Sequence, residues 1–102
     1  MLTAVHASER DVVDRECKGK AEVTLRDKTR VDCLTKDVAY EFDFAEKWAE
    51  CLTQALHYGM FTNRKGACVL IYKKPEDFKF FNRAQNLVWY YGLPIELTHI
   101  NE

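Results

Sequence analysis

Residues 67–73 (ACVLIYK) form a continuous apolar run that limits the possible folds more than any other feature of the chain. A strand reads this way when helices cover both faces of its sheet, because neither face then meets water. A helical apolar period follows over 76–91, and a second strand pattern follows over 95–100. Two strands joined by a helix pair in parallel through a right-handed crossover. The run therefore predicts a sheet with helices on both faces.

The first half of the chain predicts a hairpin and a third strand between two helices. Ser8 is suited to cap a short helix over 8–17, and alternating apolar and polar residues predict strands further on. The predicted strands are 20–26, 29–34 and 38–44, and the clearest helix is 45–58. The predicted order is helix, three strands, helix, strand, helix, strand (αβββαβαβ). We interpret residues 1–102 as a single α/β domain with a mixed β-sheet flanked by helices.

The charge balance does not by itself predict a nucleic-acid binder, because 15 basic residues face 16 acidic ones and the net charge is -1. The basic residues do gather locally, around the first hairpin and around the last helix. The first cluster is Lys18, Lys20, Arg26, Lys28 and Arg30, and the second is Lys73, Lys74, Lys79 and Arg83. Each cluster can follow a phosphate backbone or can simply be solvated. Trp89, Tyr90 and Tyr91 form an aromatic run that one helix face cannot bury, so a dimer contact is one interpretation.

The four cysteines are widely spaced, and no C-x-x-C pair suggests structural zinc. Three of them, Cys33, Cys51 and Cys68, lie in apolar-patterned segments. We therefore expect Cys17 and these three to be free thiols in a reducing compartment, with two disulfides as the alternative for an exported protein. No apolar run is long enough to span a membrane, and the start MLTAVHASERD has no signal-peptide pattern. The expectation is a cytoplasmic protein, although export stays open if the start has been trimmed.

Acidic residues lie on two strands that the hairpin pattern makes neighbours. Asp32 lies near the end of the second strand, and Glu41 and Asp43 share one face of the third. Two carboxylates held close together repel each other, and a divalent cation relieves that repulsion. Hard oxygen ligands suit Mg²⁺ or Mn²⁺. A solvated edge of the sheet is the alternative interpretation.

This stretch resembles the PD-(D/E)XK nuclease superfamily, in which an Asp precedes a loop and an acidic residue, any residue and Lys follow on the next strand. Here the stretch reads VDCL and then YEFD, so Asp32 and Glu41 match the metal-ligand positions, whereas Asp43 replaces the Lys. The resemblance implies a restriction-endonuclease-like core. It also implies a Mg²⁺- or Mn²⁺-dependent endonuclease that acts on DNA rather than RNA. Lys47, one turn into the next helix, can substitute for the missing Lys.

A second motif resembles the RecB-like and resolvase-like branch, where the helix after the acidic strand carries Gln, three residues and Tyr. Gln54 and Tyr58 match it, and both share a helix face with Lys47. The resemblance implies that Lys47 acts in catalysis with Asp32 and Glu41, and that Gln54 and Tyr58 bind the substrate. Asp43 is a further candidate metal ligand.

One more acidic residue often completes such a site. The candidates are Glu22 on the first strand, which we rank first, and Glu9 or Glu16 on the first helix. The histidines His6, His57 and His99 have no ligand spacing, and only His57 adjoins the proposed face.

Three functional hypotheses remain at this point. The first is a metal-dependent nuclease, which at this size would act as a homodimer on two DNA strands. The second is an inactive relative that binds a protein or nucleic-acid partner, which Asp43 at the Lys position favours. The third is an unrelated α/β domain with a coincidental acidic strand.

Overall fold

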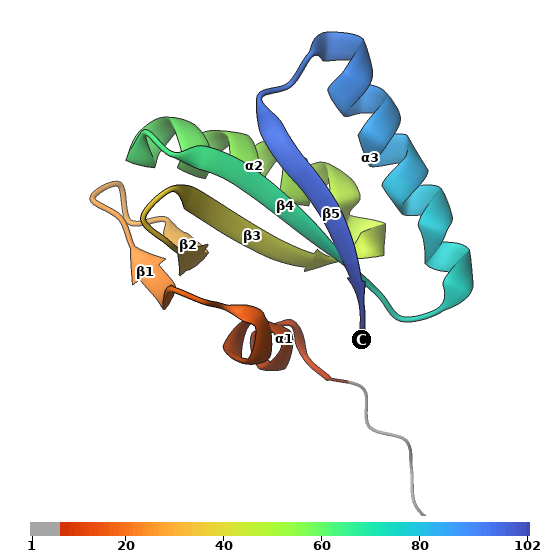
Figure 1. Ribbon diagram of the computed structural model, residues 1–102, viewed down its shortest axis with the longest axis horizontal. Coiled ribbons are helices and arrows are strands. Elements are labelled where there is room, and N and C mark those ends of the chain that lie inside the picture. Colours follow the sequence, from red (N-terminus) through yellow and green to blue (C-terminus); the bar gives the residue numbers. More distant parts are fainter. Residues whose placement is uncertain (1–6) are drawn as a thin grey trace, which may run out of the picture.

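The structure is a computed structural model that describes residues 7–102. In this part of the chain, a single mixed sheet has the strand order β1-β2-β3-β4-β5. The first three strands are antiparallel neighbours, and β3, β4 and β5 are parallel (Figure 1). The strands are β1 (Lys20–Thr24), β2 (Arg30–Leu34), β3 (Val38–Phe44), β4 (Lys65–Tyr72) and β5 (Ile95–Asn101).

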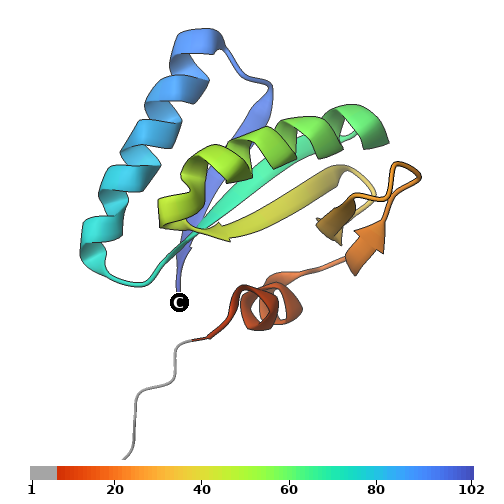
Figure 2. The ribbon, with the colours of Figure 1, turned by 180° about the vertical axis from the view of Figure 1, so that it is seen from behind.

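Helices lie on both faces of this sheet. Helix α1 (Glu9–Glu16) covers one face, while α2 (Trp48–Thr62) and α3 (Phe78–Tyr91) cover the other (Figures 1 and 2). Short 3-10 turns, Ala45–Lys47 and Pro75–Asp77, precede α2 and α3. The element order and the mixed sheet agree with the sequence prediction. None of the helices in the described part of the chain combines the length and hydrophobicity that a membrane-spanning segment requires.

The central strand β4 separates two apolar layers. Its Val69 and Ile71 pack with Val12 and Val13 of α1. Its Cys68, Leu70 and Tyr72 face the opposite way and pack with residues of α2 and α3, including Cys51, Leu52 and Ala84. This two-sided burial explains the continuous apolar run, because both faces of β4 need nonpolar side chains.

Helix α1 begins with the predicted cap. The hydroxyl of Ser8 accepts the N–H of Asp11, and the carboxylate of Asp11 accepts the N–H of Ser8, which completes a capping box. Val12 and Val13 then lie against the sheet. Residues three or four positions away share this side of a helix, so Glu9 also lies on the side that faces the sheet.

Helix α2 continues past residue 58, where the sequence analysis ended it, to Thr62. Asn63, with a left-handed backbone (φ 54°), ends the helix instead. Gly59 and Gly66 serve as a close contact between α2 and β4. A Cβ atom on Gly66 would lie 2.2 Å from the carbonyl oxygen of Ala55, so only glycine permits this approach.

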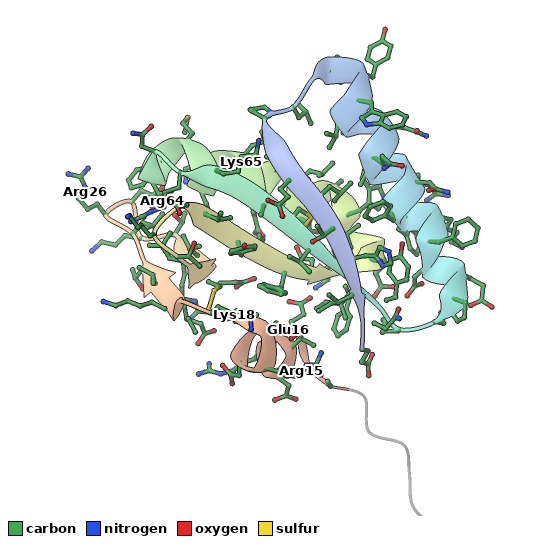
Figure 3. The ribbon with its side chains drawn as sticks, viewed as in Figure 1. Arg15, Glu16, Lys18, Arg26, Arg64 and Lys65 are labelled. Atoms are coloured by element: carbon green, nitrogen blue, oxygen red, sulfur yellow. A yellow bond between two sulfur atoms is a disulfide. The ribbon has the colours of Figure 1, made fainter. Side chains whose placement is uncertain are left out.

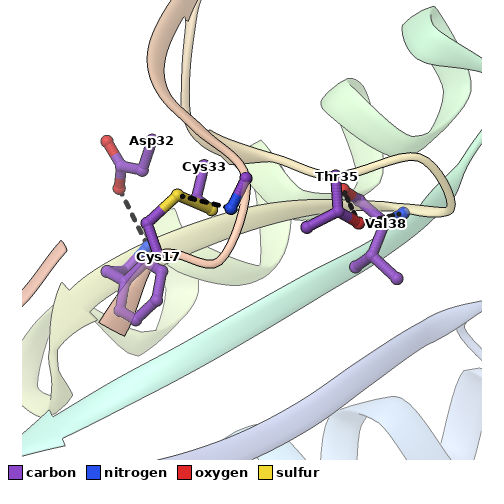
Figure 4. The surroundings of a disulfide bond; sticks show 7 residues. Cys17, Asp32, Cys33, Thr35 and Val38 are labelled. Atoms are coloured by element: carbon purple, nitrogen blue, oxygen red, sulfur yellow. Dashed lines mark hydrogen bonds between the residues drawn. A yellow bond between two sulfur atoms is a disulfide. The ribbon is translucent and has the colours of Figure 1, made fainter. Parts of the chain in front are cut away.

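The free-thiol prediction for the cysteines is wrong, because all four form disulfides. Cys17, after α1, bonds Cys33 of β2 (Figure 4), and Cys51 of α2 bonds Cys68 of β4. The sequence could not show this, because each pair joins elements that only the folded chain brings together. Each bridge ties a helix to the sheet, one on each face.

Removing the Cys51–Cys68 disulfide, which lies between the sheet and α2, tests this assignment. We expect the Cys51→Ala and Cys68→Ala double variant to lose about 3 kcal/mol of unfolding free energy, because the unfolded chain gains freedom over a loop of this length. Urea denaturation measures the loss. Addition of a reductant should weaken the unaltered protein at least as much.

Thiol titration of the unfolded, unreduced protein is the direct control. It should find no free thiol in the unaltered chain. Four reactive thiols in that sample would contradict both bridges.

Candidate functional site

The candidate site lies where β2 and β3 stop pairing. The register pairs Cys33 with Tyr40 and Leu34 with Ala39. At the next position, the carboxylate of Asp32 accepts the N–H of Phe42 at 2.9 Å, as Figure 4 shows. A side chain thus takes a hydrogen bond in the region where a strand backbone would otherwise accept it. Beyond this point the margin of β3 is open to other side chains.

Acidic side chains from three elements converge on this opening. Glu41 and Asp43 of β3 are 6% exposed each, on the side of the sheet that faces α2. Asp32 approaches from β2 and Glu9 from α1. Their mutual proximity is visible in their electrostatics, because the charge of Asp32 acts on both Glu41 and Asp43, and the charge of Glu9 acts on Asp32, Glu41 and Asp43. The predicted approach of Asp32 and Glu41 is present in the structure.

Burial and crowding disfavour the ionised forms of these carboxylates. Burial, followed by the charge and hydrogen bonding of Asp32, raises the pKa of Glu41 to about 10. Burial, followed by the charge and hydrogen bonding of Glu9, raises the pKa of Asp43 to about 8. Burial also raises the pKa of Asp32, although the N–H of Phe42 opposes this shift. Groups perturbed in this way are typical of functional sites.

Three buried oxygens of this cluster have no hydrogen-bond donor among the described residues other than a protonated neighbouring carboxyl group. They are Oε1 of Glu9, Oε2 of Glu41 and Oδ2 of Asp43. A buried carboxylate oxygen without a partner is costly, so such groups in native proteins usually serve a bound ion, a water or a reaction.

Lys47 is the cation of this site. Its Nζ lies 3.7 Å from Oε1 of Glu9, and its charge lowers the pKa of Asp43. The 3-10 turn at Ala45–Lys47 carries the residue from the end of β3 to the start of α2. Lys47 therefore turns toward the acidic cluster, as its proposed role requires, while half of its side chain stays exposed.

Tyr58 reaches the same region from α2, and Gln54 does not. Tyr58 is buried, and burial followed by the charges of Glu41 and Asp32 raises the pKa of its phenol. Gln54 is half-buried, and among residues 7–102 it makes no hydrogen bond to the cluster. It lines a shallow hollow with Ala49, Glu50 and Thr53.

The ranking of the additional acidic candidates changes with the structure. Glu22, which the sequence analysis ranked first, is bound by Arg10 at 2.9 Å and Arg30 at 3.8 Å, and its charge is only a minor influence on Asp32. Glu9 enters the cluster instead. Its position three and four residues before the buried Val12 and Val13 was the signal in the sequence. Glu16 lies at the other end of α1, beside Lys18 and Tyr40.

The histidines lie elsewhere in the described part of the chain. Nε2 of His57, on α2, lies 2.7 Å from Oδ2 of Asp27 in the turn between β1 and β2. The ring of His99 stacks on that of Tyr72. His6 falls outside the described residues. The basic residues of the first hairpin are exposed, and Arg26 points away from the body of the molecule (Figure 3).

The chemistry of these side chains fits a hard divalent cation. Carboxylate oxygens without partners are the donors that Mg²⁺ and Mn²⁺ prefer. Within residues 7–102, however, no three His, Cys, Asp or Glu side chains are already arranged around a common ion position. Mg²⁺ commonly takes one or two protein carboxylates and completes its shell with water and substrate phosphate, so two ligands are enough.

The chain matches no protein-family model, no curated protein and no solved structure.

The raised pKa values predict an unusual dependence of stability on pH. Between its usual pKa of 4.5 and its folded value of about 10, Glu41 keeps a proton in the folded state that the unfolded chain releases. The free energy of unfolding should therefore fall as pH rises from about 5 to 9. Glu41→Gln removes this group and should stabilise the protein by about 2 kcal/mol at pH 8, as measured by urea denaturation.

Glu50→Gln is the matched control, because Glu50 is an exposed residue of α2. It should leave the pH profile of stability unchanged. Equal profiles for Glu41→Gln and the unaltered protein would contradict the buried, protonated state of Glu41.

Proposed function

We propose that this protein is a Mg²⁺- or Mn²⁺-dependent DNA endonuclease with a restriction-endonuclease-like core. The observation that carries the proposal is the convergence of Glu9, Asp32, Glu41 and Asp43 at the opening between β2 and β3, with Lys47 beside them. The element order and the mixed sheet support the proposal, because the PD-(D/E)XK resemblance implies the same arrangement.

Asp32 and Glu41 would hold the cation, with Asp43 as a further ligand. A cation bound there would polarise a phosphodiester and lower the pKa of an attacking water. Glu9 replaces Glu22 as the acidic residue from outside the two central strands. Its carboxylate would either add negative charge beside the bound cation or hold the side chain of Lys47 in place.

Lys47 would stabilise the negative charge that develops on the phosphate. Its long side chain, half exposed, can move from Glu9 to a substrate without disturbing the core. Tyr58 would supply a hydroxyl group close to Asp32 and Glu41 for substrate positioning. Gln54 would have to contact a more distant part of the substrate, because it makes no hydrogen bond within the cluster.

The partner and the location belong to the same proposal. A domain of this size covers little DNA, so we propose a homodimer that acts on two strands. The sequence analysis expected the cytoplasm and kept export as the alternative. Because disulfides persist in oxidising compartments, the two bridges favour export, and we propose that location for the nuclease.

The second candidate is a non-catalytic module with the same fold, which binds a protein or nucleic acid. Asp43 at the usual Lys position favours this candidate, since Lys47 is then engaged only with Glu9 and Asp43. The two candidates differ in whether the cluster binds a metal.

A cleavage assay separates the two candidates. Plasmid, single-stranded and branched DNA are incubated with the protein and Mn²⁺, beside Asp32→Asn and Lys47→Gln variants. We expect cleavage by the unaltered protein and at least 100-fold less with either variant, because each loses a group that acts on the reacting phosphate. Lys36→Gln, in the exposed turn between β2 and β3 and outside both basic clusters, should cleave normally.

Metal binding provides the second readout. Calorimetry should detect Mn²⁺ binding to the unaltered protein and to Lys47→Gln, but not to Asp32→Asn. Absence of both cleavage and metal binding in the unaltered protein would refute the nuclease and support the binding module.

A further inference from the structure

A shallow hollow of about 540 Å³ lies between the start of α2 and the outer side of α3. It is lined by the aromatic side chains of Trp48, Tyr90 and Tyr91, together with Arg83, Asn86 and Leu87. No acidic residue lines it. Aromatic rings, a guanidinium group and an amide are the combination that proteins use to stack and hydrogen-bond an unpaired base.

The aromatic rings of this hollow are unusually exposed for a domain of this size. Tyr90 is 82% exposed and Tyr91 is 67% exposed, as expected for an aromatic run that one helix face cannot bury. Gly92 ends α3 just beyond them, so the last turn of the helix extends past the layer that buries Ala84. Rings in this position have open faces on which a ligand can stack.

The cations beside the hollow have no acidic partner. Arg83 and Lys79 form no ion pair with any residue of 7–102. Both lie over the ring of Phe80, at 5.4 Å and 5.1 Å from its centroid. The sequence of α3, FKFFNRAQNLVWYY, contains two basic residues and no acidic residue. The surface therefore suits a ligand that brings its own negative charge.

The hollow adjoins the acidic cluster through the start of α2. Trp48, which lines the hollow, directly follows Lys47, which lies beside Glu9. Figure 2 shows α2 lying over the sheet with α3 beside its N-terminal end. The hollow and the acidic cluster therefore meet the same helix start, one through Trp48 and the other through Lys47.

We propose that the hollow binds an unpaired base of a single-stranded nucleic-acid segment, with Arg83 and Lys79 contacting the adjoining phosphates. The proposal deepens the proposed function and rests on it, because it names the form of nucleic acid that lies beside the acidic cluster. A second copy of the chain fits this surface less well. Two α3 helices packed about a twofold axis would bring four cations together without a carboxylate between them.

Oligonucleotide binding in EDTA tests the proposal without cleavage. Labelled dT12 and U12 are titrated with the unaltered protein and followed by fluorescence anisotropy. A backbone of equal charge without bases serves as the matched probe. We expect dT12 to bind about 10-fold more tightly than the abasic strand, because each stacked base contributes measurable affinity. Equal binding of U12 and dT12 would show that the hollow accepts both RNA and DNA. Tighter binding of one of them would show which nucleic acid it prefers.

Variants locate the bound base. In a Trp89→Phe background, Trp48 is the only tryptophan, and dT12 should quench its fluorescence.

Tyr90→Leu should weaken dT12 binding about 10-fold. Arg83→Gln should weaken it and lower the salt dependence by about one phosphate contact. Phe78→Leu is the matched control, since Phe78 is an exposed aromatic residue of α3 that does not line the hollow.

Several results would overturn the proposal. They are no binding of dT12, equal binding of the abasic strand, or unchanged affinity in Tyr90→Leu and Arg83→Gln. A dimer that light scattering shows to dissociate in these variants, at unchanged dT12 affinity, would assign the surface to self-association. These binding measurements are made without metal, so they are independent of cleavage. Binding of dT12 without any Mn²⁺-dependent cleavage would support base binding in the hollow and refute the proposed nuclease activity. Cleavage without dT12 binding would do the reverse.

Discussion

The backbone N–H of Phe42 donates its hydrogen bond to the carboxylate of Asp32, at the point where β2 stops pairing with β3. Here a side chain, rather than the backbone of β2, accepts the hydrogen bond. From this point on, the edge of β3 is no longer paired with β2. Beyond it Glu41 and Asp43 have no paired β2 strand beside them, and Glu9 of α1 joins them. A continued ladder would have placed the backbone of β2, rather than the side chain of Asp32, at the N–H of Phe42.

The charges around this opening are not balanced by the protein alone. Four carboxylates face one half-exposed lysine, and burial raises the pKa of Glu41, Asp43 and Asp32. Replacing such a buried cluster with nonpolar residues would ordinarily stabilise a domain. A chain that keeps the cluster bears a cost in stability, and that cost is understandable if the carboxylates bind a cation or take part in a reaction.

Periodicity was enough to predict the order of helices and strands, and the hairpin was enough to predict that Asp32 approaches Glu41. Both depend on short-range geometry. The errors all concern contacts between distant segments. The bridge between Cys51 and Cys68 depends on how α2 crosses β4, and α2 continues past Gly59 because that residue packs against Gly66. The choice of Glu9 over Glu22 depends on Arg10 and Arg30, which neutralise Glu22.

The near-neutral composition is a weaker objection to nucleic-acid binding than it first appears. Burial and mutual repulsion raise the pKa of Glu41 and of Asp43, so these two groups carry less negative charge near pH 7 than the formal net charge of -1 assumes. A bound divalent cation would neutralise the cluster in the same way. The exposed basic residues of the first hairpin and of α3 remain at the surface. A phosphate backbone therefore meets a more positive surface than the composition indicates, because the acidic residues that lower the total include buried ones.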